Sequence, residues 1–155
     1  MSEPDPHTPF RPVDRDSFPG HPMPASVPPG LRLELSRARV KTGKEAAFDE
    51  WMAMLHDRYD ECLDTLSSER AAFEATFKHT EADGSMWMYH LTLIGVSGSG
   101  LDLSIPVDSA HEAFAREVKE PGWEELTPTF MIAPRHILEE MQTFGEIGQS
   151  NDDPT

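Results

Sequence analysis

Apolar and polar positions follow two successive periods from residue 31 onward. Leu31, Leu33 and Leu35 alternate with polar side chains, which indicates a half-buried strand that runs to about Val40. Further along, apolar residues recur at steps of one, three and four positions, which is the spacing of one helix face. This apolar stripe predicts a single long helix, and its members are Phe48, Trp51, Met52, Leu55, Tyr59, Cys62, Leu63 and Leu66.

The remaining pattern predicts two strands, a second helix and a last strand. Residues 71–79 alternate in polarity, and an Asp83-Gly84 turn joins them to an apolar stretch that is typical of a central strand. A helix capped by Asp108 or Ser109 follows, and segment 101–106 fits either an extra strand or the lead-in to that helix. The predicted elements are strands 71–79, 86–94 and 127–133, a helix from 108 or 109 to about 120, and a short helix over 137–141.

This order, strand–helix–strand–strand–helix–strand, is that of the ferredoxin-like fold. We therefore predict an α+β domain with a four-stranded antiparallel sheet and both long helices on one face. The other face carries apolar side chains whichever register the strands adopt, so it needs a partner. The simplest partner is a second copy of the chain, and two sheets that face each other form a homodimeric α+β barrel.

Proline and acidic residues mark the two ends of the chain. Residues 1–30 contain nine of the fourteen prolines, which lack the amide hydrogen that a helix needs. We predict that this arm is disordered and that its removal leaves stability nearly unchanged. The polar, acidic tail over residues 145–155 is predicted to be disordered as well. One folded domain then spans residues 31–144.

The net charge of −15 narrows the range of partners. An acidic surface repels the phosphates of nucleic acids and anionic lipids, so we expect neither a nucleic-acid nor a membrane partner. No stretch has the character of a signal peptide or a membrane span, and the single cysteine, Cys62, fits a reducing compartment. We therefore predict a cytoplasmic protein without an internal disulfide.

Two segments carry a resemblance to a known group of proteins. Ala38-Arg39-Val40-Lys41-Thr42-Gly43-Lys44 leads from strand to long helix, and Ser104-Ile105-Pro106-Val107-Asp108-Ser109-Ala110-His111 opens the second helix. With the order of elements, they resemble a small uncharacterised bacterial family of the dimeric α+β barrel superfamily over about residues 31–144. That superfamily includes antibiotic-biosynthesis monooxygenases, stress-response barrel proteins and haem-handling barrels. The resemblance implies the fold and dimerisation, but no single activity, because such barrels host many chemistries.

Histidine is the first candidate for chemistry because its side chain titrates near neutral pH and ligates metals. His111 falls in the first turn of the predicted second helix, where the positive helix end lowers an imidazole pKa. Asp108 lies one turn upstream as a possible orienting carboxylate, although both residues would equally serve as helix caps. His90 lies in the predicted central strand, where burial requires a bonding partner. These three are the candidate catalytic residues.

Aromatic residues are the candidates for binding a flat organic ligand. Trp87 and Tyr89 share one face of the predicted central strand. Tyr59 and Trp51 lie two turns apart on the same side of the predicted long helix, where they would line a pocket between helix and sheet. Ordinary core packing explains both pairs as well, so the sequence leaves the two interpretations open.

Three functions are compatible with these residues. A cofactor-free enzyme of the monooxygenase or cyclase type would act in biosynthesis on an aromatic or polyketide-like metabolite, with His111 or His90 as acid or base. A haem-binding barrel would use one of these histidines as an axial ligand. A non-catalytic dimer would bind a small-molecule ligand in its cavity. Metal-ligand spacings such as Cys-x-x-Cys do not occur, so no metal site is predicted and the cofactor is left unknown.

Overall fold

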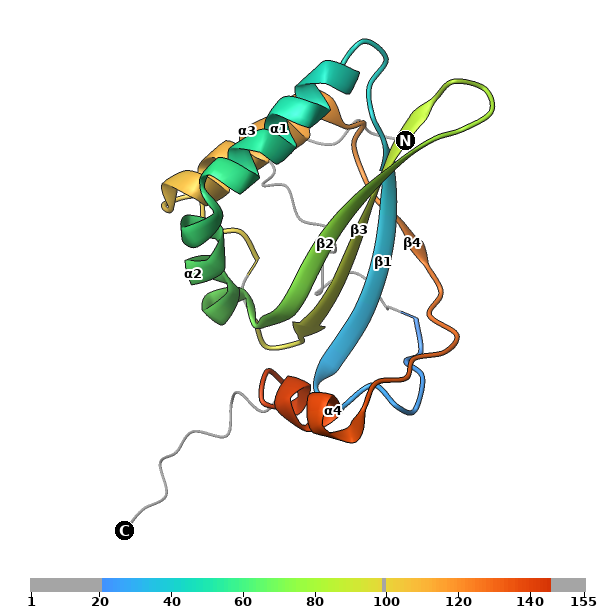
Figure 1. Ribbon diagram of the computed structural model, residues 1–155, viewed down its shortest axis with the longest axis vertical. Helices are drawn as coiled ribbons and strands as arrows, with labels where there is room; N and C mark the ends of the chain where they lie inside the picture. The colour runs from blue at the N-terminus through green and yellow to red at the C-terminus, as the bar shows by residue number, and fades with distance from the viewer. Residues whose placement is uncertain (1–20, 99, 146–155) are drawn as a thin grey trace.

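A computed structural model describes residues 21–98 and 100–145 of the chain. Its elements are β1 (Leu31–Arg39), α1 (Glu45–Asp57), α2 (Tyr59–Glu69), β2 (Ala71–Thr80), β3 (Met86–Gly95), α3 (Pro106–Val118), β4 (Glu124–Leu126) and α4 (Arg135–Gln142). The sheet forms one layer, and α1 and α3 lie side by side over one face of it (Figure 1). Among the described residues, no helix has the length and apolar character needed to cross a bilayer.

The strand order confirms the predicted fold class. The order is β2-β3-β1-β4, and every neighbouring pair is antiparallel. A ferredoxin-like βαββαβ chain arranges its strands in this way. The central pair, β1 and β3, runs in continuous register from Leu31 opposite Gly95 to Arg39 opposite Trp87. The predicted strands 71–79 and 86–94 and the short helix over 137–141 are all present within a residue or two.

One hydrophobic core joins the two long helices to one end of the sheet. Phe48 and Trp51 of α1 meet Ala115 and Val118 of α3 over Met88 of β3, and all five are buried. Burying a large apolar side chain stabilises the fold by roughly 1.5–3 kcal/mol. This core occupies only part of the space between helices and sheet, and the remainder is the cavity described below.

The predicted long helix is wrong in one respect, because it is two helices. Arg58 interrupts it with φ −110° and ψ 32°, which lies outside the helical region. Its amide still donates to the Met54 carbonyl at 3.0 Å, and the Cys62 amide donates to the Arg58 carbonyl at 3.0 Å. The backbone hydrogen bonds therefore continue across the break, and the apolar stripe continues with them. The periodicity of the sequence alone could not reveal that the helix is interrupted at Arg58.

The last strand is shorter and earlier than predicted. β4 covers residues 124–126 instead of 127–133 and pairs with Leu35–Arg37 of β1. Arg37 holds it through two hydrogen bonds to the Glu124 carboxylate, at 3.0 and 3.3 Å. Pro128, which follows closely, has no amide hydrogen for the ladder, so the chain leaves the sheet there.

The sheet face away from the helices is partly covered by the last ten residues of the arm that was predicted to be disordered. Residues 21–30 pack on this face, and Val27 is only 7% exposed in a second core with Leu31 and Leu93. Ser26 Oγ donates to the Met131 carbonyl at 2.5 Å. Residues 1–20 and 146–155, also predicted to be disordered, lie outside the described residues.

Candidate functional site

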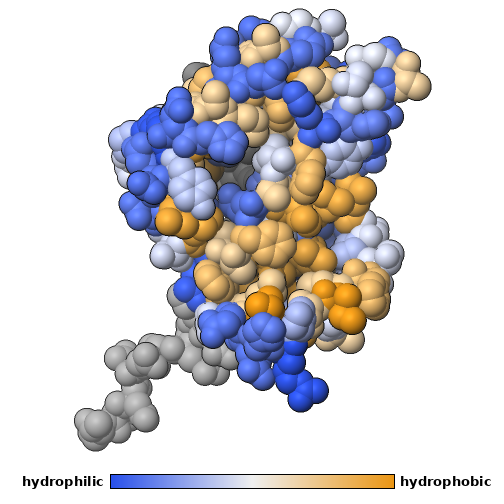
Figure 2. Space-filling view, viewed as in Figure 1, coloured by the Kyte–Doolittle hydropathy of each residue, from blue (hydrophilic) through white to orange (hydrophobic). Residues whose placement is uncertain are grey.

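A cavity of about 710 Å³ lies between the sheet and helices α1, α2 and α3. Figure 2 shows its mouth as a hollow between the mostly polar helix side and the more apolar sheet side. Apolar side chains such as Leu55, Leu63 and Ile94 form part of its wall. The ionisable side chains of its lining include Glu34, Glu69, Glu74, His90, Asp108 and His111.

The sheet wall of the cavity is polar because the strand register aligns polar side chains from three strands. Two rows cross β1, β3 and β2 on the helix side, and they are Ser36–His90–Thr76 and Glu34–Thr92–Glu74. A sheet face covered by helices is normally apolar, because a buried polar group needs a hydrogen-bond partner. This reversal of polarity coincides with the cavity and marks it as the candidate site.

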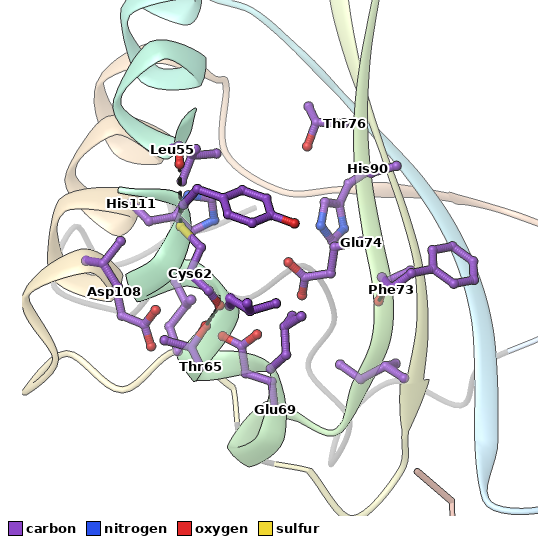
Figure 3. A pocket seen from close by; sticks show the side chains of 18 of the residues that line it. Leu55, Cys62, Thr65, Glu69, Phe73, Glu74, Thr76, His90, Asp108 and His111 are labelled. Atoms are coloured by element: carbon purple, nitrogen blue, oxygen red, sulfur yellow. Dashed lines mark hydrogen bonds between the residues drawn. The ribbon is translucent and has the colours of Figure 1, made fainter. Parts of the chain in front are cut away.

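His90 extends from β3 into the cavity, as Figure 3 shows. Within the described part of the chain its ring makes no hydrogen bond, and its nearest aromatic neighbour is Trp123, with ring centroids 6.0 Å apart. Burial lowers the pKa of His90 below its ordinary value, and the negative charge of Glu74 opposes that shift. His90 is therefore neutral at pH 7, with a lone pair on one ring nitrogen.

His111 faces His90 from α3 on the helix wall (Figure 3). The Trp51 Nε1–H donates to His111 Nδ1 at 2.8 Å. Because an indole nitrogen is only a donor, Nδ1 must carry a lone pair and the proton of neutral His111 lies on Nε2. Burial, with a smaller effect from His90, lowers the pKa of His111 to about 4. His111 therefore does not cap the helix, and its Nδ1 is occupied by the hydrogen bond from Trp51.

The sequence suggested Asp108 as a carboxylate that orients His111, but its hydrogen bond is made to the loop before α3. Its Oδ2 accepts a hydrogen bond from the Asp102 amide at 2.9 Å, which ties down the loop before α3. Ile105, not Asp108 or Ser109, occupies the N-cap position, and no side chain caps this helix. The carboxyl of Asp108 is buried, and burial raises its pKa, against the opposing effect of the Asp102 amide. It faces the cavity as a carboxylate that is costly to ionise.

Cys62 and three further carboxylates line the cavity, although the sequence did not mark them as site residues. Cys62 of α2 lines the cavity, and burial, more than the charge of Glu74, raises the pKa of its thiol. Glu69 at the end of α2 is buried, whereas Glu74 of β2 is more exposed. Polar positions on the same face of the strands as His90 are the signal that would have identified Glu74, and also Glu34.

The four aromatic candidates separate into three locations. Tyr59 lines the cavity and is largely exposed. Trp51 is in the core, only 1% exposed, and reaches the cavity through its hydrogen bond to His111. Trp87 and Tyr89 lie on the opposite face of the sheet, where the Arg37 guanidinium stacks 4.4 Å from the Trp87 ring centroid. The structure thus brings together Tyr59, His90, His111 and Asp108, but not Trp87 or Tyr89.

No metal centre is formed by the part of the chain that the structure describes. No group of three or more His, Cys, Asp or Glu side chains there is arranged to hold a metal ion. His90 has a ring nitrogen that could ligate the metal of a prosthetic group.

Comparison with known protein families identifies the family of the chain. Residues 31–139 match a family of unknown function, DUF6176. The chain belongs to this family. Neither the curated proteins nor the solved structures gave a match. The family match covers the sheet and all the helices that line the cavity, so the cavity lies wholly within the segment that family members share.

Proposed function

We propose that the protein binds a small organic molecule in the cavity and acts on it as an enzyme without a bound cofactor. The observation that supports this is the pair of polar rows, which face a cavity where core packing would require apolar side chains. Functional sites are where a sequence departs from the pattern that stability favours. The volume, about 710 Å³, lies within the usual range of roughly 300–1,000 Å³ for ligand sites.

His90 is the proposed acid–base group. It is neutral near pH 7, its ring makes no hydrogen bond to a described residue, and it faces the cavity. A neutral imidazole can take a proton from a ligand oxygen or carbon and return it later in the reaction. His111 serves this proposal as a positioning residue, because the Trp51 bond occupies Nδ1 and keeps its proton on Nε2.

An aromatic or polyketide-like metabolite is the proposed substrate. The apolar part of the wall, with Met52, Leu55, Leu63 and Ile94, provides contact for a flat ring system. The oxygenase or cyclase character of the reaction follows only from the resemblance to α+β barrel enzymes, and the cavity is compatible with both.

Occupation of the cavity is tested with Nile red, an uncharged dye whose fluorescence increases in apolar surroundings. Thr76→Trp fills the cavity from β2, and Thr80→Trp adds the same side chain at an exposed position on the same strand. We expect the wild type and Thr80→Trp to bind the dye and Thr76→Trp to lose binding. Equal binding by both variants would contradict the proposed site.

Acid–base chemistry is tested on the molecules that co-purify with the protein, identified by mass spectrometry and offered back to it. His90→Gln should lower the turnover of such a substrate by roughly 10²–10⁴-fold while binding persists. His79→Gln is the matched control, because His79 is exposed and on the opposite face of β2. Full turnover in His90→Gln would contradict the assignment of His90 as the acid–base group.

A haem-binding function has less support than an organic ligand. The two propionates of haem are anionic, whereas the described lining of the cavity contains four carboxylates and no lysine or arginine. Hemin titration tests the alternative directly. If the protein shifts the Soret band of hemin and His90→Ala does not, a haem-binding function would replace the cofactor-free proposal.

We also propose that the protein is a homodimer that pairs through the sheet face remote from the helices. Residues 21–30 cover one end of this face, but Phe77 in β2 is 54% exposed, and Trp87, Tyr89 and Leu91 of β3 lie beside it. A standard interface buries roughly 1,600 Å² in total. Two such faces in contact would close the α+β barrel that the resemblance implies.

A further inference from the structure

The strand register places two carboxylates beside His90 on the sheet wall of the cavity. Thr92 follows His90 on the same face of β3, and it pairs with two glutamates. These are Glu34 of β1 and Glu74 of β2, so each is a diagonal neighbour of His90 on an adjacent strand. Diagonal neighbours on one sheet face have Cα atoms roughly 7–8 Å apart, a distance that long side chains can bridge. His90 therefore lies between two glutamates.

These two carboxylates differ in their partners. Glu34 is buried, and Arg32 Nε lies 3.2 Å from its Oε1 as a counter-ion. Glu74 lines the cavity and is exposed, and within the part of the chain that the structure describes it forms no ion pair. In Figure 3 the side chains of Glu74 and His90 project from the sheet into the same part of the cavity. The uncompensated negative charge beside His90 is therefore that of Glu74.

The charge of Glu74 favours protonation of His90. The other ionisable side chains of the cavity lining are Glu34, His56, Tyr59, Cys62, Glu69, Asp108 and His111. His111, which faces His90 from α3, is neutral at pH 7 because its pKa is about 4. Burial lowers the pKa of His90, and the charge that opposes this effect is that of Glu74. The same charge contributes to the raised pKa of the Cys62 thiol, so its effect extends across the cavity to α2.

We propose, as a refinement that rests on the proposed function, that Glu74 is a positioning residue that makes His90 a competent base. The proton of a ligand C–H or O–H bond moves to a ring nitrogen of His90, and the electron pair of the broken bond stays on the ligand. The carboxylate of Glu74 stabilises the imidazolium that results and takes no proton itself. The proton then returns to the ligand, and His90 is neutral again.

The exposure of Glu74 matters for the timing of this effect. Water screens the carboxylate in the free protein, because the side chain is exposed. A ligand in the cavity displaces water from the lining, and the attraction between carboxylate and imidazolium is stronger where the dielectric constant is lower. Glu74 therefore acts most strongly on His90 when a substrate is bound.

The first test measures the proton affinity of His90 in the full chain without a ligand. NMR follows the histidine Cε1–H signals as a function of pH, and the His90 signal is the one missing from His90→Gln. Glu74→Gln should lower this proton affinity roughly threefold or more, because the imidazolium loses its counter-charge. Glu74→Asp should retain part of the effect, and Glu50→Gln, at an exposed position of α1, should leave the affinity unchanged. Equal proton affinities in the wild type and Glu74→Gln would overturn the pairing.

The second test measures proton abstraction from 2-tetralone, an uncharged aromatic ketone whose α-protons exchange with D₂O when a base removes them. The wild type should accelerate this exchange over buffer, and His90→Gln should lose the acceleration. Glu74→Gln should slow the exchange by roughly three- to thirtyfold with little change in KM, because Glu74 acts through His90, and Glu74→Asp should recover part of the rate. Exchange by Glu74→Gln at the wild-type rate would overturn the positioning role alone. If the wild type is no faster than His90→Gln, the acid–base function fails and the positioning role fails with it, even where the titration shows the pairing.

Discussion

The indole of Trp51 donates a 2.8 Å hydrogen bond to Nδ1 of His111, and this bond joins the hydrophobic core to the wall of the cavity. Trp51 is buried among core residues of α1, and its N–H has to find an acceptor there. His111 supplies it from α3. The bond therefore serves stability and, at the same time, fixes the tautomer of a histidine that faces the candidate site.

His111→Leu should destabilise the protein, whereas His111→Asn should be nearly neutral. Leucine leaves the buried Trp51 N–H without an acceptor, which costs about 1–3 kcal/mol in the free energy of unfolding. The Oδ1 of asparagine can take the place of Nδ1 and accept the same hydrogen. Urea unfolding of the two variants at pH 7.5 measures the difference.

A double-mutant cycle isolates this hydrogen bond from the change in packing. In a Trp51→Phe background no indole N–H exists, so His111→Leu should cost clearly less than it does in the wild type. If His111→Leu is equally costly in both backgrounds, the hydrogen bond does not carry the effect.

Stability should fall on acidification in a way that depends on His111. Its pKa is about 4 in the folded protein, against an ordinary value of 6.5. The unfolded chain therefore binds the proton more tightly, and stability is complete above pH 6.5 and decreases as the pH falls toward 4. The loss across this window is on the order of 3 kcal/mol.

His111→Asn provides the control for this pH dependence. The variant keeps an acceptor for Trp51 but cannot titrate, so its unfolding free energy should vary less between pH 6.5 and 4 than that of the wild type. His90, also of lowered pKa, and Asp108, of raised pKa, titrate in both proteins, so the comparison removes their effects apart from the smaller coupling between His90 and His111. Parallel curves for the two proteins would contradict the lowered pKa of His111.

The sequence predicted the fold well because its signals there are local. Alternation in β1 and β3 and the apolar stripe of the helices define the elements, and their order allows few topologies. The sequence pattern did not reveal the break at Arg58, because the apolar stripe and the backbone hydrogen bonds both continue across it. The last strand was misplaced because pairing with β1, through Arg37 and Glu124, is a long-range contact.

The site was predicted less completely because it depends on which sheet face the helices cover. The leucines of β1 indicated a buried face, yet these side chains pack away from the helices, against residues 21–30. The same choice of face separates Trp87 and Tyr89 from the cavity and places Glu34 and Glu74 within it. The acceptor for Trp51 lies sixty residues away at His111, which no local pattern reveals.

Removing residues 21–30 should destabilise the protein, contrary to what composition suggests. Val27 is buried against Leu31 and Leu93, and Ser26 bonds to the Met131 carbonyl. A chain that begins at residue 31 should therefore be less stable by about 2–3 kcal/mol than one that begins at residue 21. Urea unfolding of the two chains measures this. Val27→Ala in the full chain should reproduce part of the loss, and Ala25→Ser, at an exposed position, should have no effect.

Phe77→Glu should convert the protein from a dimer to a monomer. Phe77 is 54% exposed on the sheet face proposed as the interface, so a charge there would be buried against the partner without a counter-ion. Light scattering at a chain concentration near 50 µM should give twice the chain mass for the wild type and the chain mass for Phe77→Glu. Leu103→Glu is the control, because Leu103 is also an exposed apolar residue but lies in the loop before α3. A monomeric wild type would contradict the barrel. A dimer that survives Phe77→Glu but dissociates in Phe130→Glu would instead place the interface over residues 127–134, where Phe130 and Ile132 are exposed.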